Sequence, residues 1–389
     1  MTLSIKVSSL DVGYGEKLIL GDINFELKKG EILCLMGPNG SGKSTIIKTI
    51  TEHIKKLGGK IFIDGKDIDT LDQKEKAKHL SVVLTERINP ELMTVEDVIS
   101  SGRYPYTGYL GKLEDKDYKA IDEAIEIVNA ESLRNMYFSE LSDGQKQRVM
   151  LAKAICQEAE VMILDEPTSY LDVRYKIEIL GILRQLASQM GKTIILSLHE
   201  IDLIPKIADK VLQINGGNDY SYGSPDEIIN DNSVTTAFKI NRGSYSSLIG
   251  NIEMEKCITT PEVFVIGGCG SGVNIYRELN KKKIPFNAGI IFNNDIDLVV
   301  ASVLACEVIT EEAFKDISND KIKIAEQKIE DSKLIIDSGS EFTGNNRRNR
   351  ELLEFAISLN KKVVSLTNRN VKNVEYISIK QLETLISNF

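Results

Sequence analysis

One stretch of the chain has the residue types and the spacing of a phosphate-binding loop. It follows an apolar run at 31–36, typical of a buried strand, and precedes a stretch at 46–50 with helical spacing. The residues between them fit G-x-x-x-x-G-K-[ST]; they are Gly37, Pro38, Asn39, Gly40, Ser41, Gly42, Lys43, Ser44 and Thr45. Glycines allow the backbone N–H groups to approach phosphate oxygens, and the helix N-terminus faces their negative charge. We therefore expect Lys43 to reach the β- and γ-phosphates of a nucleotide and the Ser44 hydroxyl to bind Mg²⁺.

A pair of carboxylates is the second candidate for chemistry. Asp165 and Glu166 follow the aliphatic run Val161–Leu164, which is typical of a buried strand. A carboxylate in this position beside a phosphate loop can hold Mg²⁺, and the next one can accept the proton of an attacking water. Acidic residues often end strands, so the pair is informative mainly because the phosphate loop is also present. We predict that Asp165 binds the metal and that Glu166 is the general base.

The composition excludes several classes of protein. The 389 residues carry a net charge of −9, so the chain lacks the basic character of a nucleic-acid-binding protein, and we expect no nucleic-acid partner. The five cysteines are scattered without a C-x-x-C pair, which indicates a reducing compartment and argues against a disulfide scaffold or a zinc cluster. No apolar run reaches the ~18 residues of a membrane span, and the N-terminus lacks a signal-peptide pattern. We expect a soluble, cytoplasmic protein that a partner holds at the membrane if it acts there.

The spacing of apolar residues predicts the elements that position these groups. Strands are expected at 3–7, 18–27, 60–64, 80–84, 161–164 and 193–197, and helices at 46–50, 95–101, 115–129, 147–157 and 173–189. Strands that alternate with helices are typical of an α/β fold with a largely parallel sheet. The segment 104–135 is mainly helical and is expected to form a subdomain.

A second α/β domain is expected near the C-terminus. The polar segment 241–261 lacks helical spacing, and after it the alternation of strands and helices begins again. We predict domains at 1–256 and 257–389, the second of them Rossmann-like. Its expected elements lie at 262–266, 273–281, 287–292, 296–305, 333–336, 349–359 and 362–365.

The order of the motifs identifies a family. Leu-Ser-x-Gly-Gln at 141–145 lies between the phosphate loop and the strand that ends in Asp165, and alone it indicates only a helix start capped by Ser142. All motifs together closely resemble the ATP-binding-cassette (ABC) ATPases over roughly residues 2–250. The resemblance implies an ABC-type P-loop fold with a helical subdomain, which works as a head-to-tail dimer. It also implies that ATP lies between the phosphate loop of one copy and Ser142, Gly144 and Gln145 of the other.

Further positions are identified by the same resemblance. Tyr14 lies where the family places an aromatic residue that stacks on adenine, and Asp172 lies in the loop that communicates between the two ATP sites. His199 follows a predicted strand and matches the histidine that contacts the γ-phosphate. Two positions differ from the common pattern: Asp143 replaces a glycine, and Glu86 replaces a glutamine that reaches Mg²⁺ and the attacking water. A carboxylate at 86 can bind Mg²⁺, but it also adds negative charge beside the triphosphate.

The chain has a single cassette, and about a hundred residues separate Lys43 from Ser142, as in a separate transporter ATPase. Residues 94–108 and 171–175 resemble the importer group for iron–siderophore, haem and vitamin B12. That resemblance implies permease subunits in the membrane, an extracytoplasmic substrate-binding protein, and a place on the inner face of the cell membrane. Three tyrosines could form a socket for the permease or could pack inside the helical subdomain; they are Tyr104, Tyr106 and Tyr109.

The second domain has a glycine-rich loop of its own at 267–272, between a predicted strand and a predicted helix. Asn293–Asp295 and Asp337–Gly339 also follow predicted strands, so they should share one edge of the sheet, where such folds bind ligands. With the polar and basic run 342–350, they predict a pocket for a phosphate, a nucleotide or another anion; the other interpretation is that they are packing turns. The alternative function is a non-transport ABC ATPase whose second domain binds such a ligand as a switch.

Overall fold

The computed structural model describes residues 3–84, 90–108 and 111–387. The chain forms two compact units, residues 1–239 and 240–389. The boundary that we predicted, after residue 256, lies within the second unit and follows a short antiparallel strand pair. That pair consists of β11 (Gly243–Ser246) and β12 (Asn251–Met254).

A six-stranded sheet in the first unit carries the predicted motifs. Its strand order is β10-β9-β3-β8-β7-β6, and all neighbours are parallel except β9 and β10. Every residue of β3, β7 and β8 is buried, as expected for strands with helices on both faces. The strands are β3 (Ile32–Met36), β6 (Leu80–Val83), β7 (Val161–Leu164), β8 (Thr193–Ser197), β9 (Lys210–Gly216) and β10 (Asp219–Gly223).

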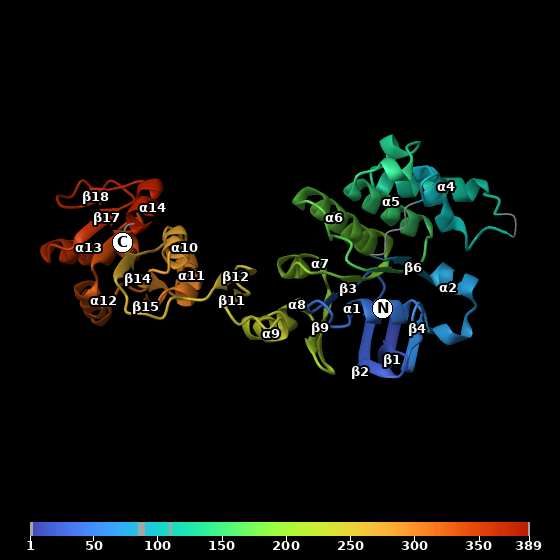
Figure 1. Cartoon of the computed structure of the whole chain (residues 1–389), viewed down its shortest axis with the longest axis horizontal. Coiled ribbons are helices and arrows are strands. Elements are labelled where there is room, and N and C mark those ends of the chain that lie inside the picture. The colour runs from blue at the N-terminus through green and yellow to red at the C-terminus, as the bar shows by residue number, and fades with distance from the viewer. Residues whose placement is uncertain (1–2, 85–89, 109–110, 388–389) are drawn as a thin grey trace. The chain divides into compact units, whose positions relative to one another are not determined.

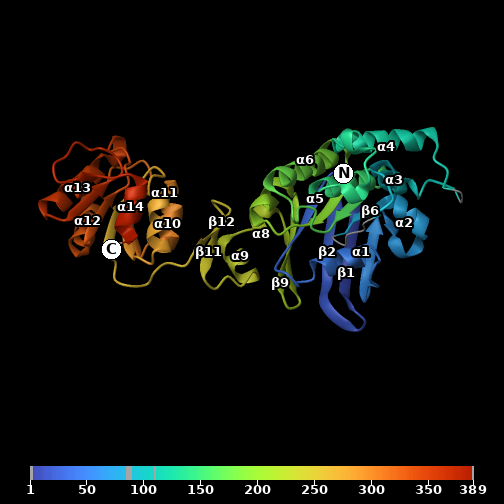
Figure 2. The ribbon, with the colours of Figure 1, turned by 45° about the horizontal axis from the view of Figure 1, so that its top comes forward.

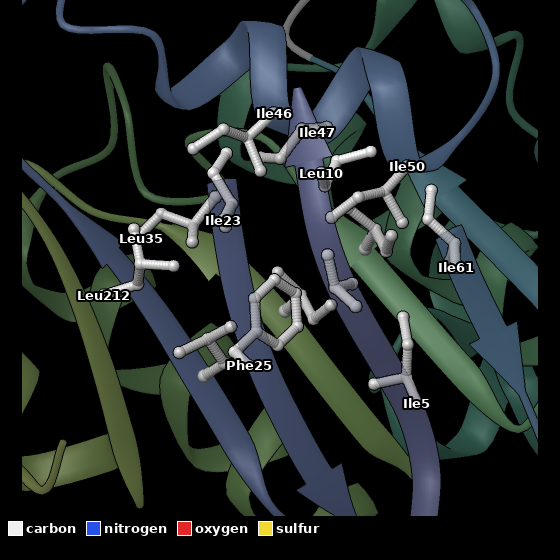
Figure 3. Packing of buried hydrophobic residues seen from close by; sticks show 14 of the residues in the cluster. Ile5, Leu10, Ile23, Phe25, Leu35, Ile46, Ile47, Ile50, Ile61 and Leu212 are labelled. Atoms are coloured by element: carbon white, nitrogen blue, oxygen red, sulfur yellow. The ribbon is translucent and has the colours of Figure 1, made fainter. Parts of the chain in front are cut away.

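A second, antiparallel sheet packs on the first helix. It consists of β2 (Lys17–Lys28), β1 (Leu3–Tyr14), β4 (Gly58–Ile63) and β5 (Lys66–Asp67), in that order. Figure 3 shows Ile46, Ile47 and Ile50 of α1 (Lys43–Ile50) beside Leu10 and Ile23 of this sheet. All five side chains are buried in one cluster, so the helix that follows the phosphate loop is held firmly.

Helices α4 and α5 of the first unit lie away from the antiparallel sheet. Figures 1 and 2 both show α4 and α5 on one side of this unit and β1 and β2 on the other. Buried Arg103 binds Asp117 of α4 at 2.9 Å and the carbonyl oxygen of Cys156 in α5 at 2.7 Å, so it ties the helical subdomain together. The helices are α2 (Gln73–His79), α3 (Val95–Ser100), α4 (Asp115–Ile127), α5 (Asp143–Cys156), α6 (Val173–Met190), α7 (Ile204–Ile207), α8 (Pro225–Ile228) and α9 (Asp231–Ala237).

The second unit is a doubly wound α/β fold. Its sheet has the order β15-β14-β13-β16-β17-β18 and is parallel throughout, which is the Rossmann arrangement. Helices α10, α11 and α14 cover one face, and α12 and α13 cover the other. The strands are β13 (Val263–Ile266), β14 (Phe286–Phe292), β15 (Glu307–Glu311), β16 (Leu334–Asp337), β17 (Lys362–Ser365) and β18 (Glu375–Tyr376). The helices are α10 (Val273–Lys281), α11 (Ile296–Leu304), α12 (Asn319–Asp331), α13 (Asn349–Ser358) and α14 (Ile379–Ser387).

The prediction of two α/β folds is therefore confirmed. Among the described residues, no helix is both long enough and apolar enough to span a bilayer.

Candidate functional site

The predicted phosphate loop connects β3 to α1. Gly40 and Gly42 have φ angles of +76° and +113°, a region that side chains disfavour and that glycine adopts readily. The Ser41 hydroxyl is buried and has no hydrogen-bond partner among the described residues. Since a buried polar group is normally paired, the loop has a donor available for a ligand. Exposed Asn39 lies at the tip of the loop, and buried Thr45 lies in the first turn of the helix.

Lys43 folds back across this loop. Its Nζ donates hydrogen bonds to the carbonyl oxygens of Gly37 at 2.7 Å and Pro38 at 3.0 Å. Burial lowers the pKa of Lys43, and the charges of Glu166 and Asp165 oppose this shift. The ammonium group is thus held beside two carboxylates by carbonyl oxygens, which can be exchanged for phosphate oxygens.

Asp165 connects the end of β7 to the phosphate loop. Its Oδ1 accepts hydrogen bonds from Ser44 Oγ at 3.3 Å and from Ser197 Oγ at 2.7 Å, and the residue is buried. Sequence reasoning did not identify Ser197. Its position at the end of β8, next to β7 in the sheet, is a signal that could have indicated it.

Glu166 and His199 form a second contact at this edge of the sheet. The Glu166 Oε1 atom lies 2.5 Å from His199 Nε2, and its Oε2 atom accepts a hydrogen bond from Ser169 at 2.9 Å. Burial raises the pKa of Glu166, but hydrogen bonds from His199 and Ser169 and the charge of Lys43 outweigh it and lower the pKa overall. Glu166 is therefore an ionised acceptor at neutral pH. Sequence reasoning also missed Ser169.

The structure thus brings five of the predicted site residues together: Lys43, Ser44, Asp165, Glu166 and His199. Among the described residues, no hydrogen bond joins Ser142, Gly144 or Gln145 to them. Those three residues begin α5, where the Ser142 Oγ atom accepts from the Gln145 amide at 3.4 Å and the Gln145 side chain accepts from the Ser142 amide at 2.9 Å.

The remaining predicted residues lie on separate elements. Tyr14 is 53% exposed at the end of β1, and Asp172 caps α6 by accepting a hydrogen bond from the Tyr175 amide at 3.0 Å. Glu86 and Tyr109 lie outside the described residues.

Two of the predicted socket tyrosines differ in their surroundings. Tyr106 packs inside the helical subdomain, where its ring centre lies 4.1 Å from the Arg103 guanidinium and its hydroxyl donates to the Gln157 carbonyl oxygen at 3.1 Å. Tyr104 is 77% exposed and therefore accessible to a partner.

The glycine loop of the second unit has its amide groups occupied. The fully buried Asp297 accepts hydrogen bonds from the amides of Gly268 at 2.6 Å, Gly272 at 2.9 Å and Val273 at 3.1 Å. Asp295 accepts from the next amides, those of Cys269 at 2.6 Å and Gly270 at 3.3 Å. The chain's own carboxylates therefore occupy the positions where an anionic ligand would bind.

Packing also accounts for two of these glycines. A β-carbon would lie only 2.0 Å from the Tyr276 hydroxyl at Gly267 and only 2.3 Å from it at Gly272. The loops that follow β13 and β16 do meet at one edge of the sheet, as predicted, since Ser271 Oγ lies 2.6 Å from Ser338 Oγ.

The basic side chains predicted near this edge pair with acidic groups of the chain instead. Arg347 binds Asp316 and Arg348 binds Glu351. Asp337, at the end of β16, accepts hydrogen bonds from Arg369 at 2.7 and 2.9 Å.

Comparison with known proteins identifies the first unit. Residues 20–169 match the family described as ABC transporter. Over 280 residues the chain is 43% identical to an uncharacterized ABC transporter ATP-binding protein, MJ0873 of Methanocaldococcus jannaschii, which covers 72% of this chain and 97% of that protein. The chain belongs to the ABC transporter ATP-binding proteins. Because such proteins bind and hydrolyse ATP, this ABC protein is an ATPase.

Other relatives carry more specific names. The ABC protein is 34% identical to the siderophore transport system ATP-binding protein YusV of Bacillus subtilis, over 61% of this chain and 86% of that one. It is 32% identical to the iron(3+)-hydroxamate import protein FhuC of the same organism, over 61% of this chain and 88% of that one.

Solved structures resemble the first unit as well. A metal-chelate type ABC transporter in an inward-facing conformation matches with a TM-score of 0.55 and 27% identity, over 61% of this chain and 90% of that one. The dimeric cassette MJ0796, bound to ADP and phosphate, matches with a TM-score of 0.50 and 25% identity, over 57% of this chain and 98% of that one. Residues 286–388 of the second unit match a family described only as the MJ0874 family.

Proposed function

We propose that this ABC ATPase powers the uptake of an iron chelate through a separate membrane permease. Relatives named for siderophore and iron(3+)-hydroxamate transport and a structural neighbour of metal-chelate type support this class of cargo. Haem and cobalamin are the other cargoes of the importer group that the sequence resembles. The single observation that carries the proposal is the group of Lys43, Ser44, Asp165, Glu166 and His199 around one loop.

ATP fits the phosphate loop of the first unit. No side-chain oxygen of a described residue accepts a hydrogen bond from the amides of residues 39–43, and the Ser41 hydroxyl has no partner there. Lys43 leaves the carbonyl oxygens of Gly37 and Pro38 and binds the β- and γ-phosphates. Tyr14 stacks on the adenine, because its exposed ring is accessible at the end of β1.

Mg²⁺ fits the donors beside the loop. Ser44 and Asp165 present hard oxygen ligands, the kind that Mg²⁺ prefers, only 3.3 Å apart. When bound, the ion neutralises charge that develops on the phosphates. We propose Glu86 as a further ligand in place of the usual glutamine.

Glu166 and His199 have separate roles in hydrolysis. Glu166 accepts the proton of the attacking water, since it is ionised and borders the loop. His199 holds Glu166 by the 2.5 Å contact until a γ-phosphate arrives, and then contacts that phosphate. Glu166 is thereby released to face the water.

The proposed partners follow from the same resemblance. Two copies of the ABC protein form a head-to-tail dimer in which Ser142, Gly144 and Gln145 of one copy face the ATP of the other, and Asp172 lies between the sites. The dimeric cassette among the structural neighbours supports this arrangement. The dimer binds permease subunits on the cytoplasmic face of the membrane, with exposed Tyr104 at the contact, and an extracytoplasmic protein delivers the cargo.

Capture and transport together test the proposal. A tagged full-length chain with Glu166→Gln is expected to retain ATP and to copurify a polytopic membrane protein from its native membranes. Vesicles that hold the purified complex should take up an iron–hydroxamate chelate only with ATP, in preference to haem and cobalamin. Recovery of the ATPase without any membrane protein would contradict the transport role.

The non-transport alternative loses its main support. It relied on a nucleotide or another anionic ligand at this edge of the second sheet, where Asp295 and Asp297 already accept hydrogen bonds from the loop amides.

A further inference from the structure

Two cysteines of the second unit lie together at the amino edge of its sheet. Cys257 precedes β13 in the chain, and Cys306 directly precedes β15. The Cys306 thiol donates to the carbonyl oxygen of Cys257 at 3.2 Å and lies 3.7 Å from that of Thr259. The Cys257 sulfur lies 3.4 Å from Thr259 Oγ1 and 3.4 Å from the carbonyl oxygen of Lys283. Both sulfur atoms therefore contact Thr259 and share one site.

We propose that Cys257 and Cys306 form a reversible intramolecular disulfide, which makes this edge of the second unit a thiol-modification site. The oxidant is a low-molecular-weight disulfide of the glutathione class, R–S–S–R. The Cys257 thiolate attacks one sulfur of R–S–S–R, forming a mixed disulfide and releasing the first R–S⁻. The Cys306 thiolate then attacks the Cys257 sulfur and releases the second R–S⁻. Each released thiolate takes up one of the two protons lost by the cysteines, so two protein thiols are oxidised and one R–S–S–R becomes two R–SH.

The surroundings of the two thiols set this order. Both thiols donate a hydrogen bond to a carbonyl oxygen, but Cys306 directly precedes a strand of the sheet, and burial raises its pKa, so Cys306 is the poorer first nucleophile. Both cysteines are only half-buried, so a small disulfide can reach them.

The chain around Cys257 can adapt to the bond. Residues 255–262 belong to no helix or strand, and Ile258 is 87% exposed. A disulfide requires sulfur atoms about 2.0 Å apart. Because residues 255–262 lie outside the strands, Cys257 can move toward Cys306 while the strands of the sheet keep their hydrogen bonds.

The other cysteines have no such neighbour. Cys34 and Cys156 are buried in the first unit, where burial raises the pKa of both thiols. Cys269 is exposed, but it follows the carboxyl end of β13 and therefore lies at the opposite edge of the sheet. It provides an internal control, an exposed single thiol in the same unit.

The disulfide would close a loop of about fifty residues that contains β13, α10, β14 and α11. Crosslinks of that length restrict the unfolded chain strongly, so the oxidised second unit should melt roughly 10 °C higher than the reduced one.

Mass spectrometry of the full chain tests the proposal. The protein is treated with oxidised glutathione, remaining thiols are alkylated, and the chain is cut with trypsin and a glutamate-specific protease. The second enzyme cuts at Glu262 and so separates Cys257 from Cys269. A Cys257–Cys306 crosslink that dithiothreitol releases is expected, together with a glutathione adduct on Cys269.

Matched variants sharpen the test. Cys306→Ser should leave a glutathione adduct on Cys257 and should remove the crosslink and the rise in melting temperature. Cys269→Ser should keep the crosslink and the rise in melting temperature. ATP turnover checks that each variant is folded in the first unit. Separate adducts on Cys257 and Cys306, a Cys257–Cys269 crosslink, or two unmodified thiols beside a modified Cys269 would each overturn the proposal.

Discussion

The two units carry glycine loops with the same spacing of glycines. Both follow a buried strand, precede a helix and have the spacing G-x-x-G-S-G, at 37–42 and 267–272. The Ser41 amide donates to the carbonyl oxygen of Pro38 at 3.2 Å, and the Ser271 amide donates to that of Gly268 at the same distance. Gly40 and Gly270 have φ angles of +76° and +77°. The turn in the middle is therefore common to both loops, but the backbone differs at the last glycine, where φ is +113° at Gly42 and −82° at Gly272.

The side chains around the two loops also differ. The first loop leads into Lys43 and Ser44, whereas the second leads into Val273 and an asparagine. In the first unit, Asp165 lies beside the helix start and binds hydroxyl groups, which leaves the loop amides available. In the second unit, Asp297 binds the amides themselves. In the second unit the fold's own carboxylates therefore take the amides that an anion would need, whereas in the first unit they do not.

The largest expected effect concerns the carboxylate that faces the first loop. Glu166→Gln should lower ATP turnover about 10²–10⁴-fold, the usual contribution of a general base, and leave thermal unfolding unchanged. Steady-state phosphate release and calorimetry measure the two quantities. The control is Glu126→Gln, on the exposed surface of α4, which should behave as wild type. Undiminished turnover in Glu166→Gln would show that another group is the base.

The residue that follows each loop offers a matched pair. Lys43→Ala should lower turnover about 10²–10³-fold, because it removes a charge aimed at the transferred phosphate. Val273→Ala, at the corresponding position of the second loop, should leave turnover and nucleotide binding unchanged. If Val273→Ala also weakens ATP binding, the second loop is a nucleotide site and the contrast between the loops fails.

Asp297 should matter for stability. In Asp297→Asn the amide nitrogen would face N–H donors, so the second unit should lose about 3 kcal/mol while ATP turnover stays within twofold. Hydrogen exchange of α10 and β14 in the full chain reports this loss separately from the first unit. Asp295→Asn is the matched control; its carboxylate also accepts from three amides, but it is only half-buried and should cost less, about 1 kcal/mol. Equal, negligible losses would mean that the carboxylates do not hold the loop.

The smallest effect concerns pH. Because hydrogen bonds lower the pKa of Glu166 below its ordinary value of 4.5, turnover should not decline through protonation of Glu166 between pH 6 and pH 8. Ser169→Ala removes one of these hydrogen bonds and should move the acid limb of kcat/KM to higher pH, by less than about one unit. Threonine at 169 keeps the hydroxyl and should restore the profile. A shift to lower pH would contradict the assigned role of Ser169.

The candidate site of the first unit could be predicted largely from short local motifs in the sequence. Lys43, Ser44, Asp165 and Glu166 were predictable because their spacing and the adjacent apolar runs lie within short stretches of sequence. The bounds of α10 and β17 were predicted as the structure has them.

Features that depend on strand partners were not predictable. Ser197 acquires its contact with Asp165 only through the pairing of β7 with β8. Asp297 occupies the loop after β13 only because β14 is its neighbour in the sheet. The charged helix α12 was missed because only three of its thirteen residues are buried, too few to give a clear apolar spacing.

Backbone hydrogen exchange at both loops tests the central claim most directly. The full-length Glu166→Gln protein is compared with and without saturating ATP and Mg²⁺, and then with NAD⁺ and inorganic phosphate. Apart from that of Ser41, which is hydrogen-bonded, we expect the amides of residues 39–45 to exchange quickly without ligand and slowly with ATP. We expect the amides of residues 268–273 to be protected throughout and to respond to none of these ligands. Fast exchange at 268–273 that any of the ligands suppresses would contradict the account, because the second loop would then be a working anion site.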